Sequence, residues 1–138
     1  MSRSSKKKTR PSQPETSTPA GTPVFAATIL VLAIGLTWIF WYGLWSGGGL
    51  IGGDLYTYFF PQKTFFAERL QAGEFPLWNS NIGHGVPLVA ESQTGAFYPF
   101  NYFAYRFLPV NTAYNFVQIL HYILAFVFTG MYVRRLGY

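Results

Sequence analysis

Two uncharged apolar runs, separated by a long aromatic segment, most constrain what this chain can fold into. The first, 24–45, would extend about 33 Å as a helix, enough to cross a hydrocarbon core of about 30 Å. The second, 113–133, is equally free of charge and ends at Arg134 and Arg135. We therefore expect an all-α membrane protein with two transmembrane helices.

The first run could instead be a cleaved signal peptide. It is too long for one, and no Ala-x-Ala cleavage site follows it. Trp38, Trp41, Tyr42 and Trp45 gather at its far end, as an interfacial aromatic belt would. The pattern favours an uncleaved span.

The positive charges predict the orientation of these spans. Lysine and arginine precede the first run within residues 3–10 and follow the second at Arg134 and Arg135. By the positive-inside rule both termini are cytoplasmic, and the segment between the runs is extracytoplasmic. The expected parts are a tail (1–23), a span (24–45), an extracytoplasmic loop (46–112), a span (113–133) and a cytoplasmic end (134–138).

Composition supports a membrane class and argues against nucleic-acid binding. Only 11% of the residues are charged, against a usual share of roughly 25%. The net charge of +5 belongs to the first ten residues, and the remainder sums to zero. No basic face with interleaved aromatics appears, so we expect no nucleic-acid partner. The tail, 1–23, has no apolar cluster and is predicted to be disordered.

The many aromatic residues of the loop predict that it lies against the membrane and is not a solvated linker. The stretch "PQKTFFAERLQAG" predicts a short helix, with Pro61 at its first position and Gly73 after its end. The stretch 97–109, "FYPFNYFAYRFLP", is suited to lie along the interface. Between them, 77–88 has turn chemistry without a period.

Asp54 is the loop carboxylate nearest the first span and follows the glycine-rich "GGGLIGG". In a partly apolar site near lipid headgroups it could accept a proton. The alternative is an aspartate at a turn, solvated by headgroup water. Glu74 reads as a surface residue after a helix stop, whereas Glu91 has no such simple explanation.

The other polar groups suggest metal and phosphate contacts. His84, in "GHGVP", could bind a divalent cation together with Glu91 and Asp54, but no HExxH-type spacing supports this. We therefore expect no firm metal site. Lys63, Arg69 and Arg106 are candidate partners for an anionic phosphate; alternatively each is a snorkelling interfacial anchor.

The second span carries a polar stripe, formed by Asn115, Gln118, Tyr122 and Thr129 with His121 at its margin. Polar side chains at membrane depth usually face protein or water. The stripe therefore suggests further transmembrane helices, from the same or another chain, as partners.

Three motifs follow one another after the first apolar run: "GDLYTYFFP" (53–61), "GEFPLWNSNIGHGVP" (73–87) and "YPFN" (98–101), and then an apolar run that bears a histidine and ends in "RRLG". In this order they resemble the start of a YfhO-type bacterial membrane protein, one of the polytopic GT-C-like glycosyltransferases. The resemblance covers roughly 52–138.

The resemblance implies a multi-pass enzyme of the bacterial cytoplasmic membrane. Such enzymes transfer sugar from a polyprenyl-phosphate donor to a cell-envelope acceptor on the outer side. Asp54 would be the catalytic general base or would orient the acceptor hydroxyl. The residues expected to bind substrate are Tyr58, Arg69, Trp78, His84, Glu91 and Arg106, with Arg69 or Arg106 neutralising the departing phosphate.

The chain departs from the family in length, because family members have many more spans. We therefore expect an amino-terminal portion that is inactive by itself. The alternative is a small non-catalytic membrane protein, or a truncated gene product, that acts as a partner-binding subunit.

Overall fold

The computed structural model describes residues 22–49 and 52–137, and these residues are mostly helical with no strand. One isolated antiparallel bridge joins Asn79 to Val86. The helices are α1 (Thr22–Phe40), α2 (Tyr42–Trp45), α3 (Phe59–Gln71), α4 (Pro99–Phe107) and α5 (Val110–Arg135), with short 3-10 helices η1 (Gly53–Leu55) and η2 (Ser92–Thr94). The predicted disordered tail lies outside the described residues, except for Thr22 and Pro23, which begin α1.

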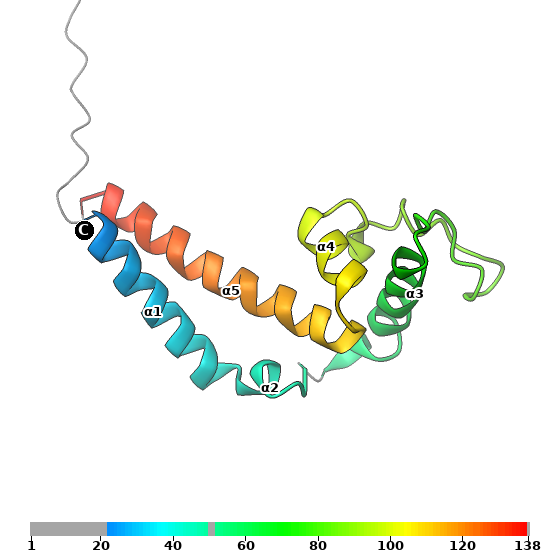
Figure 1. The fold of residues 1–138 in the computed structure, drawn as a ribbon, viewed down its shortest axis with the longest axis horizontal. Helices are drawn as coiled ribbons and strands as arrows, with labels where there is room; N and C mark the ends of the chain where they lie inside the picture. Colours follow the sequence, from blue (N-terminus) through cyan, green and yellow to red (C-terminus); the bar gives the residue numbers. More distant parts are fainter. Residues whose placement is uncertain (1–21, 50–51, 138) are drawn as a thin grey trace, which may run out of the picture.

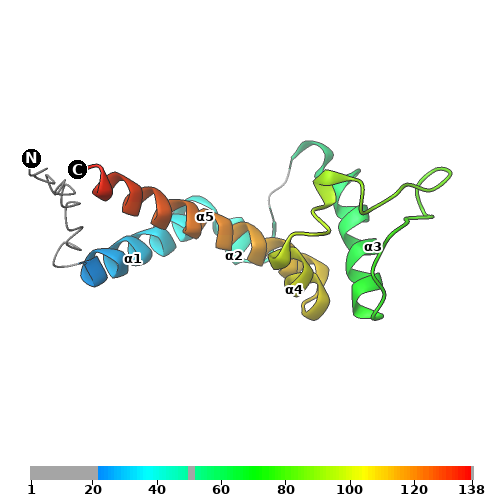
Figure 2. The same ribbon diagram turned by 90° about the horizontal axis from the view of Figure 1, so that it is seen from above.

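Helices α1 and α5 lie side by side and antiparallel, and they form one arm of an elongated molecule (Figures 1 and 2). Gly130 lies against Ile29, Trp41 stacks on Tyr122, and the Arg134 guanidinium lies 4.4 Å from the centre of the Phe25 ring. Both helices are long and apolar enough to cross a membrane, with candidate spans of Pro23–Phe40 and Val110–Arg135. Most of the large apolar side chains of α1 are exposed, and several of those of α5 are exposed too.

The first apolar run is not one continuous helix, as 24–45 was predicted to be. At Trp41 the backbone leaves helical geometry, with φ −123° and ψ 40°, and a separate turn of helix, α2, follows. The amides of Gly48 and Gly49 then donate to the Gly43 carbonyl and end α2. The hydropathy pattern cannot predict such a break, because the residues on both sides of it are equally apolar.

Helix α3 begins at Phe59, before the predicted first position Pro61, and ends at Gln71. Gly73 follows with a φ of +86°, and its amide donates to the Leu70 carbonyl at 2.9 Å. A glycine adopts this left-handed conformation without the steric cost that a Cβ would add. The buried face of α3 carries Phe65, Phe66 and Leu70.

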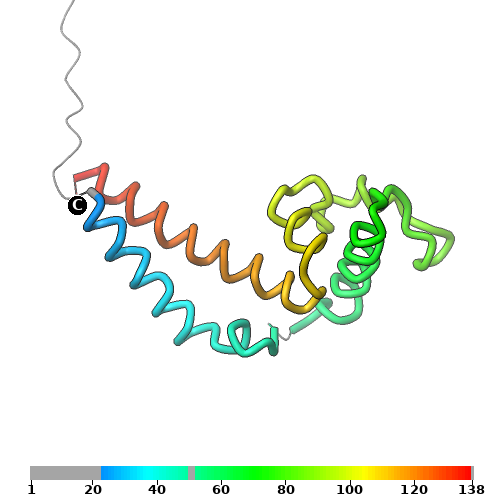
Figure 3. The backbone as a smooth tube through the Cα atoms, viewed as in Figure 1, coloured from blue at the N-terminus to red at the C-terminus, as the bar shows by residue number. Residues whose placement is uncertain are grey.

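Helix α4 folds back along the first half of α5 and packs between α5 and α3 (Figure 3). The Tyr105 ring meets Phe66 edge to face, with centroids 5.8 Å apart. The Gln71 side-chain amide donates to the carbonyls of Tyr105 and Leu108, both at 3.1 Å, and so ties the end of α3 to α4. The core of this second arm contains Phe65, Phe66, Ala67, Leu70, Leu88, Ala96, Ala104, Tyr105, Ala113 and Val117.

The hairpin-like loop between α3 and η2 extends away from the α1–α5 pair (Figure 1). Its bridge between Asn79 and Val86 brings Trp78 over Gly85, where a Cβ would lie 2.2 Å from the indole Nε1. Gly85 also has a φ of +94°. Both the contact and the conformation therefore require glycine at this position.

The close approach at Gly130 predicts that a larger residue will separate α1 from α5. A Cβ at Gly130 would lie 3.0 Å from Ile29 Cδ1. Small residues allow such contacts between helices, whose axes lie about 8–10 Å apart. Gly130→Leu should increase the distance between spin labels at Leu32 and Phe128 by roughly 2 Å or more in pulsed electron resonance.

Gly35→Leu is the matched control, because nothing lies within 4 Å of a Cβ at Gly35. An unchanged label distance in Gly130→Leu would contradict the described packing.

Candidate functional site

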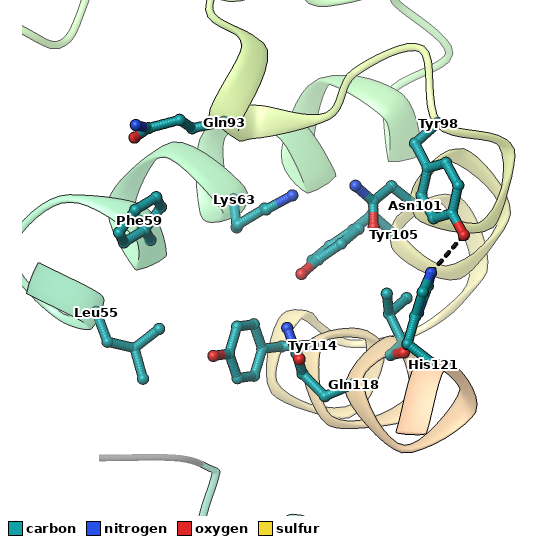
Figure 4. A pocket seen from close by; sticks show the side chains of 11 residues that line it. Leu55, Phe59, Lys63, Gln93, Tyr98, Asn101, Tyr105, Tyr114, Gln118 and His121 are labelled. Carbon is teal, nitrogen blue, oxygen red and sulfur yellow. Dashed lines mark hydrogen bonds between the residues drawn. The ribbon is translucent and has the colours of Figure 1, made fainter. Parts of the chain in front are cut away.

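A cavity of about 550 Å³ lies where α3, α4 and the first half of α5 meet (Figure 4). Its wall is mainly aromatic, and Lys63 of α3 is the cation that lines it. The lining residues are Leu55, Phe59, Lys63, Gln93, Tyr98, Asn101, Tyr105, Tyr114, Val117, Gln118 and His121. The cavity thus combines one positive group with flat apolar surfaces and neutral hydrogen-bonding side chains.

Lys63 is held inside this wall by contacts from two other elements. Its ammonium donates to the Thr94 carbonyl at the end of η2 and lies 5.2 Å from the centre of the Tyr105 ring. Burial lowers the pKa of Lys63 to about 8, and the charge of Glu91 opposes part of this shift. Close to neutral pH the side chain is therefore charged, yet poorly solvated, and an anion would stabilise it.

Glu91 positions the segment that meets Lys63. Its carboxylate caps η2 by accepting the backbone amides of Gln93 at 3.2 Å and Thr94 at 2.7 Å. The Thr94 hydroxyl lies 2.6 Å from Glu91 Oε2 and 2.8 Å from Gln62 Oε1, and it can donate to one of them at a time. Partial burial raises the pKa of Glu91, but these hydrogen bonds and the charge of Lys63 outweigh it and lower the pKa overall. Glu91 is therefore a charged structural support beside the cavity.

Tyr98 and His121 form a hydrogen-bonded pair in the cavity wall (Figure 4). The other ring nitrogen, His121 Nδ1, lies 2.6 Å from the Val117 carbonyl oxygen. A carbonyl only accepts, so Nδ1 carries a proton, and in neutral His121 the Nε2 atom accepts from the Tyr98 hydroxyl. The pair fixes the start of α4 against α5.

Asp54 lies in η1 with an exposed side chain and does not line the cavity. The next residue, Leu55, does line it, so the carboxylate belongs to a segment that borders the cavity. The backbone carbonyl of Asp54 accepts the Tyr58 amide at 2.8 Å. Tyr58 itself is exposed and packs edge to face on Phe59.

The two arginines that were expected to bind phosphate form other contacts. Arg69 forms an ion pair with Glu74 at 2.9 Å on the exposed end of α3. Arg106 donates to the Leu70 carbonyl and so joins α4 to α3. Neither lines the cavity, whereas Lys63, the third cation of the same set, does.

Trp78 and His84 are exposed residues of the loop between α3 and η2, away from the cavity lining. The structure does not bring His84, Glu91 and Asp54 together. Within residues 22–49 and 52–137, no three His, Cys, Asp or Glu side chains are grouped so that they could hold a metal ion.

Several residues of the polar stripe on α5 contact other residues of this chain, are buried or line the cavity. Tyr122 stacks on Trp41 with ring centroids 4.3 Å apart, Gln118 and His121 line the cavity, and Asn115 is buried. Thr129 is exposed. Within the described residues, Tyr122 and His121 of the stripe therefore contact side chains of this chain, Trp41 and Tyr98.

Sequence reasoning missed the roles of Tyr98, Asn101 and Tyr105, which lie in one aromatic stretch. These residues line the cavity because α4 folds back along α5. No local sequence pattern predicts this arrangement. Lys63 was one of three cations that the sequence offered as phosphate partners, but no sequence feature separated it from Arg69 and Arg106.

Comparisons with protein-family models, with curated proteins and with solved structures each found no match.

The environment of Lys63 predicts an unusual titration. Carbon-13 reductive methylation followed by NMR in micelles should show a signal, absent in Lys63→Arg, that titrates near pH 8 rather than near the ordinary lysine value of about 10.4. Glu91→Gln should lower this pKa further, because the negative charge of Glu91 favours the charged ammonium.

Glu74→Gln is the control, since Glu74 pairs with Arg69 and not with Lys63. Titration of Lys63 near its ordinary value would show that the side chain is solvated and would contradict the described burial.

Proposed function

We propose that the chain forms part of a membrane glycosyltransferase that uses a polyprenyl-phosphate-linked sugar and transfers it to a cell-envelope acceptor. The observation that carries the proposal is the position of Lys63 in an aromatic cavity beside the paired apolar helices. A lipid-linked sugar phosphate presents an anion between an apolar chain and a sugar. Those three parts match a cation, aromatic faces and neutral hydrogen-bonding side chains.

The phosphate of the donor is assigned to Lys63. An ammonium has three donors, so Lys63 can keep its bond to the Thr94 carbonyl while it binds a phosphate oxygen. Burial makes the unpaired charge costly, and an incoming phosphate offsets that cost. Arg69 and Arg106 already have acceptors in Glu74 and the Leu70 carbonyl.

Asp54 is assigned as the general base of the transfer. An acceptor approaching from solvent would meet its exposed carboxylate next to Leu55, at the border of the cavity. Asp54 takes the proton of the acceptor hydroxyl, whose oxygen forms a bond to the anomeric carbon of the sugar. The bond from that carbon to the phosphate oxygen breaks, and its electron pair leaves with the polyprenyl phosphate held at Lys63.

The proposed location is the bacterial cytoplasmic membrane, with α1 and α5 as spans and both termini in the cytoplasm. Arg134 and Arg135 lie in the last turn of α5, at the end that meets the start of α1. Arg134 and Arg135 at this end of α5, and the basic residues 3–10 that precede α1 in the sequence, favour the cytoplasmic side. The α3–α4 arm and its loop then face outward, with α4 as an interfacial helix.

This topology predicts the accessibility of the loop. The chain has no cysteine, so a single cysteine at the exposed Ser80 is a clean reporter. A membrane-impermeant maleimide should label Ser80→Cys in intact cells, after permeabilisation of an outer membrane where one is present. Labelling that requires rupture of the cytoplasmic membrane would reverse the orientation.

The assigned roles predict a separation of binding from chemistry. Lys63→Gln should raise the KM for the lipid-linked donor roughly 10-fold, because it removes a charge-assisted bond to phosphate. Asp54→Asn keeps the shape but removes the base, so kcat should fall roughly 10²–10⁴-fold with little change in KM. The assay is sugar transfer from the lipid-linked donor by the complete enzyme that contains this chain, in membranes with matched expression of the variants.

Arg69→Gln and Glu74→Gln are matched controls, because both residues belong to an exposed ion pair outside the cavity. If Asp54→Asn retains most activity, the assignment of the base is wrong. If polyprenyl phosphate does not bind and no variant affects transfer, a non-catalytic partner-binding subunit becomes the better description.

A further inference from the structure

Three tyrosines line the cavity, and their hydroxyl groups have different surroundings. The Tyr98 hydroxyl donates to His121, and Tyr114 is only partly buried. Tyr105 is 1% exposed, yet within residues 22–49 and 52–137 its hydroxyl forms no hydrogen bond to another residue. A buried hydroxyl without a partner costs free energy. The acceptor for Tyr105 must therefore come from water or from a ligand in the cavity.

Tyr105 is held by contacts of its ring and of its backbone, so its hydroxyl has a fixed position. The ring packs edge to face on Phe66, with centroids 5.8 Å apart, and the Gln71 side-chain amide donates to the Tyr105 carbonyl at 3.1 Å. Figure 4 shows the hydroxyl directed into the space between Lys63 and Tyr114. The Lys63 ammonium lies 5.2 Å from the centre of the same ring. A neutral donor and a cation therefore border one part of the cavity.

Both groups are hydrogen-bond donors near neutral pH. Burial, together with the neighbouring Tyr114, raises the pKa of Tyr105, so its hydroxyl keeps its proton. Glu91 favours the charged ammonium of Lys63. A hydrogen bond to a charged acceptor is roughly twice as strong as one between neutral groups, and a phosphate group presents several acceptor oxygens. The two donors therefore match a phosphate better than they match a neutral sugar hydroxyl.

We infer that the Tyr105 hydroxyl is a second group that binds the phosphate of the lipid-linked donor, donating to one phosphate oxygen while the Lys63 ammonium binds another. This assignment rests on the proposed function. When the bond from the anomeric carbon to the phosphate oxygen breaks, its electron pair stays on that oxygen, and the phosphate gains negative charge. Two fixed donors stabilise this charge more than the ammonium alone would.

Binding of the phosphate can be separated from sugar transfer with a probe that has no sugar. Geranyl phosphate carries a short isoprenoid chain and a phosphate group, and geraniol has the same chain without the phosphate. Both are titrated into the full chain in detergent micelles and followed by calorimetry, with empty micelles as the blank. Tyr105→Phe keeps the ring and removes only the hydroxyl. Tyr102→Phe is the matched control, because Tyr102 lies on the same helix, is 39% exposed and does not line the cavity.

Tyr105→Phe should weaken the binding of geranyl phosphate roughly 10-fold, as expected for the loss of a hydrogen bond to a charged group. Its affinity for geraniol should be unchanged, and Tyr102→Phe should bind both probes as the unaltered chain does. An equal loss of affinity for geraniol would show that the hydroxyl supports the cavity wall instead of binding phosphate, and would overturn the inference.

Lys63→Gln distinguishes a failure of this inference from a failure of the proposed function. If Lys63→Gln binds geranyl phosphate more weakly while Tyr105→Phe binds it normally, the role of Tyr105 is wrong and the phosphate site at Lys63 stands. If the unaltered chain does not bind geranyl phosphate, or Lys63→Gln binds it equally well, the phosphate site of the proposed function is wrong, and the role of Tyr105 with it.

Discussion

The antiparallel register between α1 and α5 determines where every other element lies. Ile29 against Gly130 and Trp41 against Tyr122 fix this register, and the greater length of α5 follows as a projection on one side only. The first half of α5 gives α4 and α3 a surface to pack on, through Ala113 and Val117. Without it, the aromatic loop would have no core to join, because its own helices are too short to be stable alone.

The cavity depends on a balance of charges rather than on a cluster of reactive groups. Burial disfavours the charged Lys63, whereas Glu91 favours it, and Glu91 is itself kept ionised by the amides and hydroxyl that it accepts. Glu91 thus has two effects: its carboxylate caps the start of η2, and its negative charge favours the charged form of Lys63. A substitution at Glu91 would alter both, which makes it a poor test of catalysis by itself.

The sequence predicts the long elements well and the site only in part. Two apolar runs and the Gly73 stop depend on composition and local conformation, so a long apolar helix that includes 113–133 and a helix ending at Gln71 could be foreseen. The break at Trp41 could not, because it lies among residues of equal hydropathy. The choice of Lys63 over Arg69 and Arg106 could not either, since it depends on which face of α3 and of α4 turns toward α5. The place of Asp54 in the chemistry remains a prediction from resemblance.

The composition of the cavity wall also bears on how a ligand of the proposed kind would be held. Tyr98 and His121 lie in the wall, while Lys63 enters it from α3 and lies 5.2 Å from the centre of the Tyr105 ring. Under the proposed function, the faces of the aromatic rings would contact the sugar or the apolar chain of the donor, whereas the ammonium would bind its phosphate. The cation and the aromatic faces would thus bind different parts of one lipid-linked donor.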